Sequence, residues 1–179
     1  MDSATTTPAV ATDAEQCAQM FAKPQKEHEW LQRLVGEWTF ESECMGEPGQ
    51  PTHKTRGTET VKSLGGLWIV GNGQGGMPAG GTATMMITLG FDPQRNRFVG
   101  TWIGSMMTQL WIYDGELDAS NRVLTLNSEG PSFPDPVKRA KYQDIIEIKS
   151  DDHRVLTSRC LGDDGKWTPF MTAHYRRAK

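Results

Sequence analysis

The chain has 179 residues, a length that suits one domain better than two, and its 19 basic and 22 acidic residues leave a formal net charge of −3. With a pI near 5.8, this balance argues against a dedicated nucleic-acid binder, whose basic surface usually raises the pI above about 9. Apolar residues make up 36% and charged residues 23% of the chain. That composition supplies a hydrophobic core and argues against wholesale disorder.

The first 22 residues are rich in Ala and Thr and contain neither a positively charged start nor an apolar run, so we expect neither a signal peptide nor a membrane anchor there. No stretch of the sequence approaches the roughly 18 consecutive apolar residues of a spanning helix. The three cysteines, Cys17, Cys44 and Cys160, are an odd number without paired spacing, which favours reduced thiols and a cytoplasmic location. We therefore expect a disordered leader over residues 1–23 and a single domain over residues 24–179.

One short helix is predicted over residues 25–35. Its apolar residues, Trp30, Leu31, Leu34 and Val35, recur at helical spacing. Pro24 stands at its start and a glycine follows its last residue, as is typical of helix ends.

From residue 37 onward the hydrophobic pattern changes to a period of two, which is typical of β-strands. Ten strands are predicted, over residues 37–45, 52–62, 67–74, 82–91, 98–105, 107–113, 122–129, 141–149, 153–161 and 167–177. The runs 98–105 and 107–113 fit either one long kinked strand or two short ones. Residues 114–121 are predicted as a turn, and residues 130–136, with three prolines, as a loop. Most connections are short, so neighbouring strands are expected to be antiparallel.

About ten antiparallel strands with a single helix must hide their sheet edges. Closure into a barrel does so most completely, and a sandwich is the alternative. One helix is too little to cover an open sheet, so we favour an all-β, up-and-down barrel with the short N-terminal helix near one mouth. Barrels of about eight or more strands leave an interior that holds a small ligand.

Several blocks carry a family resemblance, in order along the chain: His28-Glu29-Trp30-Leu31-Gln32-Arg33-Leu34-Val35-Gly36-Glu37-Trp38, Thr88-Leu89-Gly90-Phe91-Asp92, Phe98-Val99-Gly100-Thr101-Trp102-Ile103 and Phe170-Met171-Thr172-Ala173-His174-Tyr175-Arg176-Arg177. With them the chain, from about Gln25 to its C-terminus, resembles the bacterial domain-of-unknown-function family fifteen seventy-nine. The resemblance implies a calycin-like β-barrel, related to lipocalins, fatty-acid-binding proteins and nitrobindins. It implies no activity and no catalytic residues.

The segment Gly71-Asn72-Gly73-Gln74-Gly75-Gly76 matches the glycine spacing of dinucleotide-binding loops. That motif requires a helix whose N-terminus meets the phosphates, and here another predicted strand follows. We interpret the segment as a hairpin tip or a loop at the barrel rim.

The four histidines, His28, His53, His153 and His174, show no metal-ligand spacing, so we predict no metal and no bound cofactor. His174 differs from the others because it lies within the last predicted strand. If it points inward, it could act in acid–base chemistry, or ligate haem as in nitrobindin-like barrels.

Acid–base chemistry would also need carboxylates or nucleophiles inside the barrel. Glu129 and Asp144 lie in predicted strands, and either one would be worth testing if it pointed inward beside Arg159. No serine stands in the strand–turn–helix setting of a nucleophile elbow.

Tryptophan, tyrosine and methionine residues gather on the middle strands and on the last one. Methionine adapts to irregular shapes, and Trp and Tyr join an apolar body to a polar tip, so these residues suit either a packed core or a pocket for an apolar or aromatic molecule. The candidate ligand-binding residues are Trp68, Met86, Trp102, Met106, Gln109, Trp111, Tyr113, Met171 and His174.

Three functions follow from this pattern. The first is a barrel that sequesters or carries a small apolar or aromatic molecule, with no nucleic-acid or membrane partner. The second is an enzyme that uses His174, Tyr113 or Glu129 for acid–base chemistry, which requires at least two of them in one cavity. The third is an interaction module that uses a sheet edge or the exposed helix face for oligomerisation, for example as a homodimer.

Overall fold

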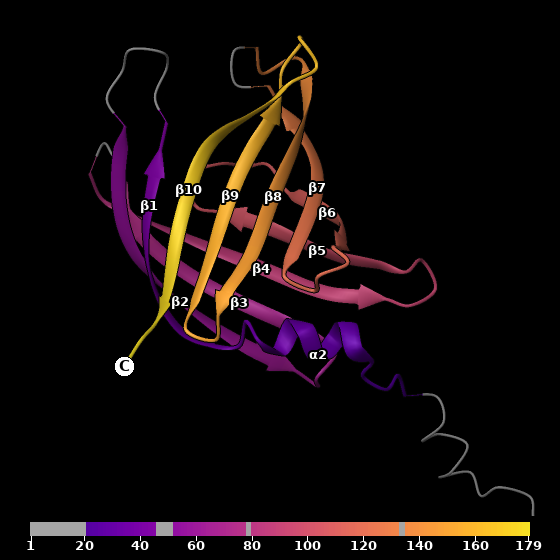
Figure 1. Ribbon diagram of the computed structural model, residues 1–179. Coiled ribbons are helices and arrows are strands. Elements are labelled where there is room, and N and C mark those ends of the chain that lie inside the picture. Colours follow the sequence, from indigo (N-terminus) through magenta and orange to yellow (C-terminus); the bar gives the residue numbers. More distant parts are fainter. Residues whose placement is uncertain (1–20, 46–51, 78–79, 133–134) are drawn as a thin grey trace, which may run out of the picture.

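The computed structural model of the protein describes residues 21–45, 52–77, 80–132 and 135–179. These residues form one helix and ten strands that close into an antiparallel barrel (Figure 1). The elements are α2 (Lys26–Gln32), β1 (Gly36–Cys44), β2 (His53–Leu64), β3 (Trp68–Gly76), β4 (Thr82–Asp92), β5 (Arg97–Gly104), β6 (Trp111–Leu117), β7 (Val123–Pro131), β8 (Arg139–Ser150), β9 (His153–Leu161) and β10 (Trp167–Arg177).

Each strand pairs with its neighbour in the chain, and β1 pairs with β10 to close the sheet. The predicted antiparallel up-and-down barrel of ten strands is therefore confirmed, and the sandwich alternative is wrong. The predicted helix over residues 25–35 is confirmed in a shorter form. The predicted leader lies outside the described residues, except for residues 21–23.

The largest differences from the predicted strand boundaries lie around β6, whereas β3, β7 and β8 differ by one or two residues at each end. Residues 107–110 are a connection and not a strand, whereas Asp114 to Leu117, predicted as a turn, continues β6. The acidic residues of this segment face outward: Asp114 and Glu116 both form ion pairs with Arg97 of β5. The turn was predicted because these charged residues on the outer face of a strand give the segment the polar composition of a turn.

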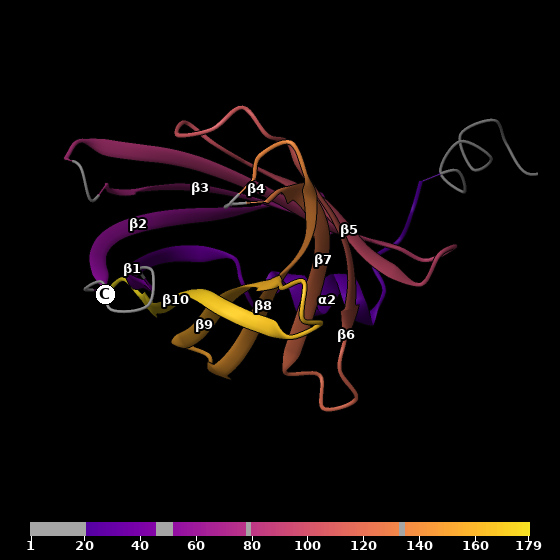
Figure 2. The ribbon, with the colours of Figure 1, turned by 90° about the horizontal axis from the view of Figure 1, so that it is seen from above.

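The helix lies across one end of the barrel, as predicted, next to the hairpins that join β2 to β3 and β4 to β5 (Figures 1 and 2). Trp30, Leu31 and Leu34 are buried there. The Trp30 indole donates a hydrogen bond to the Asn121 carbonyl in the β6–β7 hairpin, 2.9 Å away, and its ring packs edge-on against Phe98.

A compact apolar core fills the helix end of the barrel. Its buried members include Trp38, Val61, Ile69, Leu89, Phe91, Phe98, Leu124 and Ile148, together with the helix residues. The core closes this end to solvent, so any space inside the barrel must lie toward the opposite end.

Candidate functional site

A cavity of about 580 Å³ occupies the barrel above this core. Because side chains alternate across a strand, every second residue of each strand points into it. Apolar and aromatic groups predominate, among them Phe40, Met85, Ile87, Leu89, Trp102, Trp111, Tyr142, Leu156, Phe170 and Met171. This size and character are typical of sites for small organic ligands.

The first polar group in the cavity is a carboxyl on β8 with two hydroxyl neighbours. Asp144 accepts hydrogen bonds from the Tyr113 hydroxyl of β6 and the Ser158 hydroxyl of β9. Burial raises the pKa of Asp144 above its ordinary value, although the Ser158 and Tyr113 hydrogen bonds oppose this rise. Burial, and then the neighbouring Asp144, raise the pKa of Tyr113 well above its ordinary value. The group therefore provides a protonatable site in an apolar setting.

The second polar group is a buried ion pair closer to the helix end. Glu59 of β2 pairs with the guanidinium of Arg154 of β9, and both side chains are about nine-tenths buried. The guanidinium lies between two aromatic rings, 4.7 Å from the ring centre of Trp38 and 4.3 Å from that of Tyr175. These cation–π contacts help to compensate the loss of water around the charge. Burial and the nearby Glu59 raise the pKa of Tyr175 above its ordinary value.

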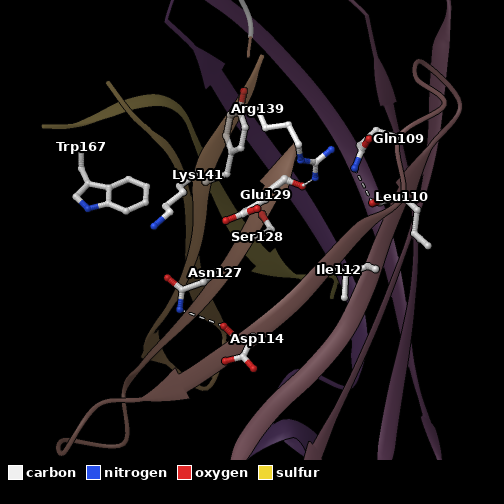
Figure 3. A pocket seen from close by; sticks show the side chains of 11 residues that line it. Gln109, Leu110, Ile112, Asp114, Asn127, Ser128, Glu129, Arg139, Lys141 and Trp167 are labelled. Atoms are coloured by element: carbon white, nitrogen blue, oxygen red, sulfur yellow. Dashed lines mark hydrogen bonds between the residues drawn. The ribbon is translucent and has the colours of Figure 1, made fainter. Parts of the chain in front are cut away.

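A groove of about 550 Å³ lies on the outer wall where β6 and β7 diverge (Figure 3). Only four cross-strand pairs join the two strands, from Asp114–Asn127 to Leu117–Leu124. Beyond Asp114 the strands separate, and Figure 3 shows Gln109, Leu110 and Ile112 on one side of the gap and Glu129, Arg139 and Lys141 on the other. Ser128 and Tyr142 line both this groove and the interior cavity, so the two spaces lie on either side of a thin wall.

Trp111 lies on the cavity side of this gap. Its ring packs edge-on against Tyr142, with 4.9 Å between ring centres, and it lies against the backbone of Gly130, where an added Cβ would be 2.4 Å from the indole. The indole N–H lies 3.1 Å from the Met107 sulfur. The side wall of the cavity at this point is therefore made of side chains and not of a continuous sheet.

Five of the predicted ligand-binding residues do line the cavity: Trp102, Met106, Trp111, Tyr113 and Met171. They come from β5, β6, β10 and the β5–β6 connection, so the fold brings them together from distant parts of the sequence. Whether they contact a ligand stays a prediction.

The other four lie outside the cavity, and an interior position for them is wrong. Trp68 and Met86 occupy the outward register of β3 and β4, where both are 39% exposed. The neighbouring Met85 faces inward instead. Gln109 lies in the β5–β6 connection and lines only the outer groove.

His174 points out of the barrel on β10, so haem ligation inside the barrel through this residue is wrong. Its ring stacks on His153 with 5.5 Å between centres, and their nearest ring nitrogens are 3.2 Å apart. Burial, followed by Arg176 and His174, lowers the pKa of His153. Glu129 is also exposed, so His174, Tyr113 and Glu129 do not share a cavity, and the acid–base mechanism based on them is wrong.

The glycine-rich segment of residues 71–76 is strand β3 and not a rim loop, so that interpretation is wrong. Gly71, Gly73 and Gly75 face inward, and side chains from neighbouring strands lie over them. An added Cβ at Gly71 would lie 2.7 Å from the Ile87 methyl, and one at Gly75 would lie 2.9 Å from the Phe40 ring. The next element is β4, so this segment precedes a strand and not a helix.

Sequence reasoning missed Glu59, Arg154 and Ser158, and it placed Asp144 beside the wrong arginine. Arg159 faces outward, where it donates to the Gln143 side chain at 2.7 Å and lies over the Trp167 ring. The two-residue alternation of β9 was the available signal, because it places Arg154, Leu156 and Ser158 on one face of the strand, and this face lines the cavity. The pairing of Arg154 with Glu59 has no such signal, because β2 and β9 are far apart in sequence.

The sequence also matches a known protein family. Residues 23–177 match the family described as "Protein of unknown function (DUF1579)". The chain belongs to this family. The predicted resemblance is thus confirmed over nearly the whole described domain. None of the curated proteins matches the sequence significantly.

Two solved structures share the fold of this DUF1579 protein. The S-type phycobiliprotein lyase CPES from Guillardia theta is 13% identical, with a TM-score of 0.57 and coverage of 86% of this chain and 93% of that one. Rv2717c from M. tuberculosis is 11% identical, with a TM-score of 0.57 and coverage of 88% and 100%. At these identities the likeness concerns the fold, a calycin-like barrel.

Two further features of the described ranges bear on the site. No helix within them has the length and apolar character needed to cross a membrane. Nor do they bring three or more His, Cys, Asp or Glu side chains together in a way that could hold a metal ion.

Proposed function

We propose that this protein binds a small apolar or aromatic molecule inside the barrel and carries or sequesters it. The observation that carries the proposal is the cavity of about 580 Å³ above the closed core. A hollow of this size lined by Trp, Phe, Leu and Met side chains favours an apolar occupant, since burial of apolar surface drives association. The methionines Met85 and Met171 allow the wall to adapt to the shape of the ligand.

A fluorescence titration tests this proposal with N-phenyl-1-naphthylamine, an uncharged aromatic dye whose emission rises in apolar surroundings. We expect saturable binding with one dye per chain. Ala173→Phe fills the cavity, because Ala173 of β10 is buried and lines it. This variant should weaken dye binding at least tenfold.

The matched control is His174→Phe, which places the same ring one residue along the strand on the exposed outer face. It should bind the dye as the wild type does. Circular dichroism and thermal unfolding establish that both variants are folded. Equal binding by folded Ala173→Phe and wild type would show that the dye binds elsewhere and would overturn the proposal.

We also propose that the protein is located in the cytoplasm, with its cysteines reduced, and we predict that it forms a homodimer. Both cysteines in the described part of the chain, Cys44 and Cys160, are free thiols, which suits a reducing compartment. Cell fractionation tests the location, and light scattering over a concentration series tests the dimer. Recovery of the protein from the cell exterior would contradict the cytoplasmic location. A monomer at every concentration would contradict the homodimer.

A further inference from the structure

The ion pair inside the cavity contains a hydrogen-bond donor that the protein does not use. Arg154 has only 7% of its surface exposed. One terminal nitrogen donates to Glu59, and the guanidinium lies between the rings of Trp38 and Tyr175. The Arg154 Nε, however, is buried and has no hydrogen-bond partner, the single such side-chain atom in the part of the chain that the structure describes.

An unused N–H of this kind is costly when it is buried, because it has lost its contact with water and gained no acceptor. Buried polar groups in proteins are nearly always paired with protein, water or ligand atoms. Arg154 is one of the residues that line the cavity. A shift of the guanidinium would turn this covered N–H toward the cavity, where an acceptor atom of a bound molecule would be its natural partner.

We propose that the ligand is uncharged and presents a carbonyl-type oxygen to Arg154, while its apolar or aromatic body fills the rest of the cavity. This inference rests on the proposed function, which it extends by naming the polar group of the ligand.

The charge balance around Arg154 decides between an uncharged acceptor and an anion. Glu59 already neutralises the guanidinium. A ligand carboxylate at the Nε would bring a second negative charge close to Glu59 in a region of low dielectric, where like charges repel strongly. A carbonyl oxygen accepts the hydrogen bond without that repulsion.

Three naphthalene probes of similar size test the inference on the wild-type protein. The ketone is 6-propionyl-2-(dimethylamino)naphthalene, the parent compound is 6-propyl-2-(dimethylamino)naphthalene, which has a methylene group in place of the carbonyl, and the anion is 6-(dimethylamino)-2-naphthoate. Displacement of N-phenyl-1-naphthylamine gives their relative affinities. We expect the ketone to bind at least tenfold more tightly than the parent compound and than the anion. Its carbonyl stretching frequency should fall on binding, as expected for an acceptor of a hydrogen bond.

Two variants change the recognition in opposite ways. Glu59→Gln leaves the guanidinium with an uncompensated positive charge, so the affinity of the naphthoate relative to the ketone should rise at least tenfold. The double variant Glu59→Gln/Arg154→Met removes both the donor and the charge and should bind ketone and parent compound equally. The control Arg97→Met/Glu116→Gln removes the ion pairs of Arg97 with Asp114 and Glu116 from the outer wall and should keep the wild-type order of affinities.

The outcomes separate this inference from the proposed function. If folded wild-type protein binds none of the probes, including N-phenyl-1-naphthylamine, the proposed function fails. If the probes bind but ketone and parent compound have equal affinity, or the naphthoate binds most tightly, the inference is overturned and the proposed function stands. The wild-type series decides this by itself if the double variant does not fold.

Discussion

Two carboxyl groups lie deep inside the barrel, and the residues around each one compensate its burial differently. Asp144 receives hydrogen bonds from two hydroxyls, those of Tyr113 and Ser158. Glu59 is compensated by the full positive charge of Arg154. A hydroxyl pair stabilises a carboxylate less than a cation does, so the two groups should respond differently to pH and to substitution.

For Asp144 the expected effect is a pH-dependent loss of stability. Because its pKa is raised in the folded protein, the folded state binds more protons than the unfolded state once the pH exceeds the ordinary aspartate pKa of about 3.9. The free energy of unfolding therefore falls as the pH rises from about 4 until it passes the raised pKa. Asp144→Asn lacks this decline, so urea denaturation should show its stability relative to wild type increasing with pH across that interval.

The control for this experiment is Glu129→Gln, which removes a carboxylate from the exposed face of the adjacent strand β7. It should not reproduce the trend. A stability of Asp144→Asn that falls relative to wild type as the pH rises would mean that the folded protein favours the carboxylate, contrary to the raised pKa.

For the ion pair, the single and double substitutions should differ sharply. Glu59→Gln or Arg154→Met alone leaves one buried charge without its partner, and each should cost about 3–5 kcal/mol of unfolding free energy. The double variant removes both charges and should cost well below the sum of the two, with a coupling of up to about 3 kcal/mol. Chemical denaturation of the four proteins measures this coupling. Additive costs would show that the pair does not interact as described.

Strand β3 shows how a local pattern can point to the wrong structure. Its glycine spacing resembles a phosphate-binding loop, but the glycines alternate with Asn72 and Gln74 in the two-residue period of a strand. Because the inward glycines have no side chains, side chains from β1, β2 and β4 pack over this part of the inner wall. The glycines thus serve close packing on the inner wall.

Gly71→Ala should therefore destabilise the protein by about 1–3 kcal/mol, the usual cost of overpacking, because its Cβ would lie 2.7 Å from Ile87. Gly76→Ala, at the end of the same strand, is the matched control, since nothing lies within 4 Å of its added Cβ. Thermal unfolding of the two variants compares them. Equal unfolding temperatures would contradict the close packing on this face.

Local sequence information was also insufficient to predict the boundaries of β6 and its separation from β7. The residues from Asp114 to Leu117 have the composition of a turn, and it is their ion pairs with Arg95 and Arg97 that show the acidic groups to belong to the outer face of a sheet. The separation of β6 from β7 beyond Asp114 has no counterpart in the hydrophobic pattern. Nor does that pattern indicate that, beyond this point, the Trp111 ring of β6 packs edge-on against Tyr142 of β8.

For the molecule as a whole, the sequence was sufficient to predict the order of the elements and their closure. Ten runs of period two, short connections and a single helix leave few topologies other than an up-and-down barrel. The cavity wall was harder to predict. Met85 and Met86 are adjacent and chemically identical, so the assignment of the inward one depends on the register of the whole strand. The facing pair of Glu59 and Arg154 arises only when the barrel closes.

The adjacent methionines provide the most direct test of ligand binding inside the barrel. Carbon-13 labelling of the methionine methyl groups allows each to be followed by NMR during a titration with N-phenyl-1-naphthylamine, with Met85→Leu, Met86→Leu and Met171→Leu used for assignment. We expect saturable shifts of the Met85 and Met171 methyls, which line the cavity, and an unchanged signal for Met86 on the outer face. Movement of Met86 while Met85 and Met171 stay fixed would contradict binding inside the barrel.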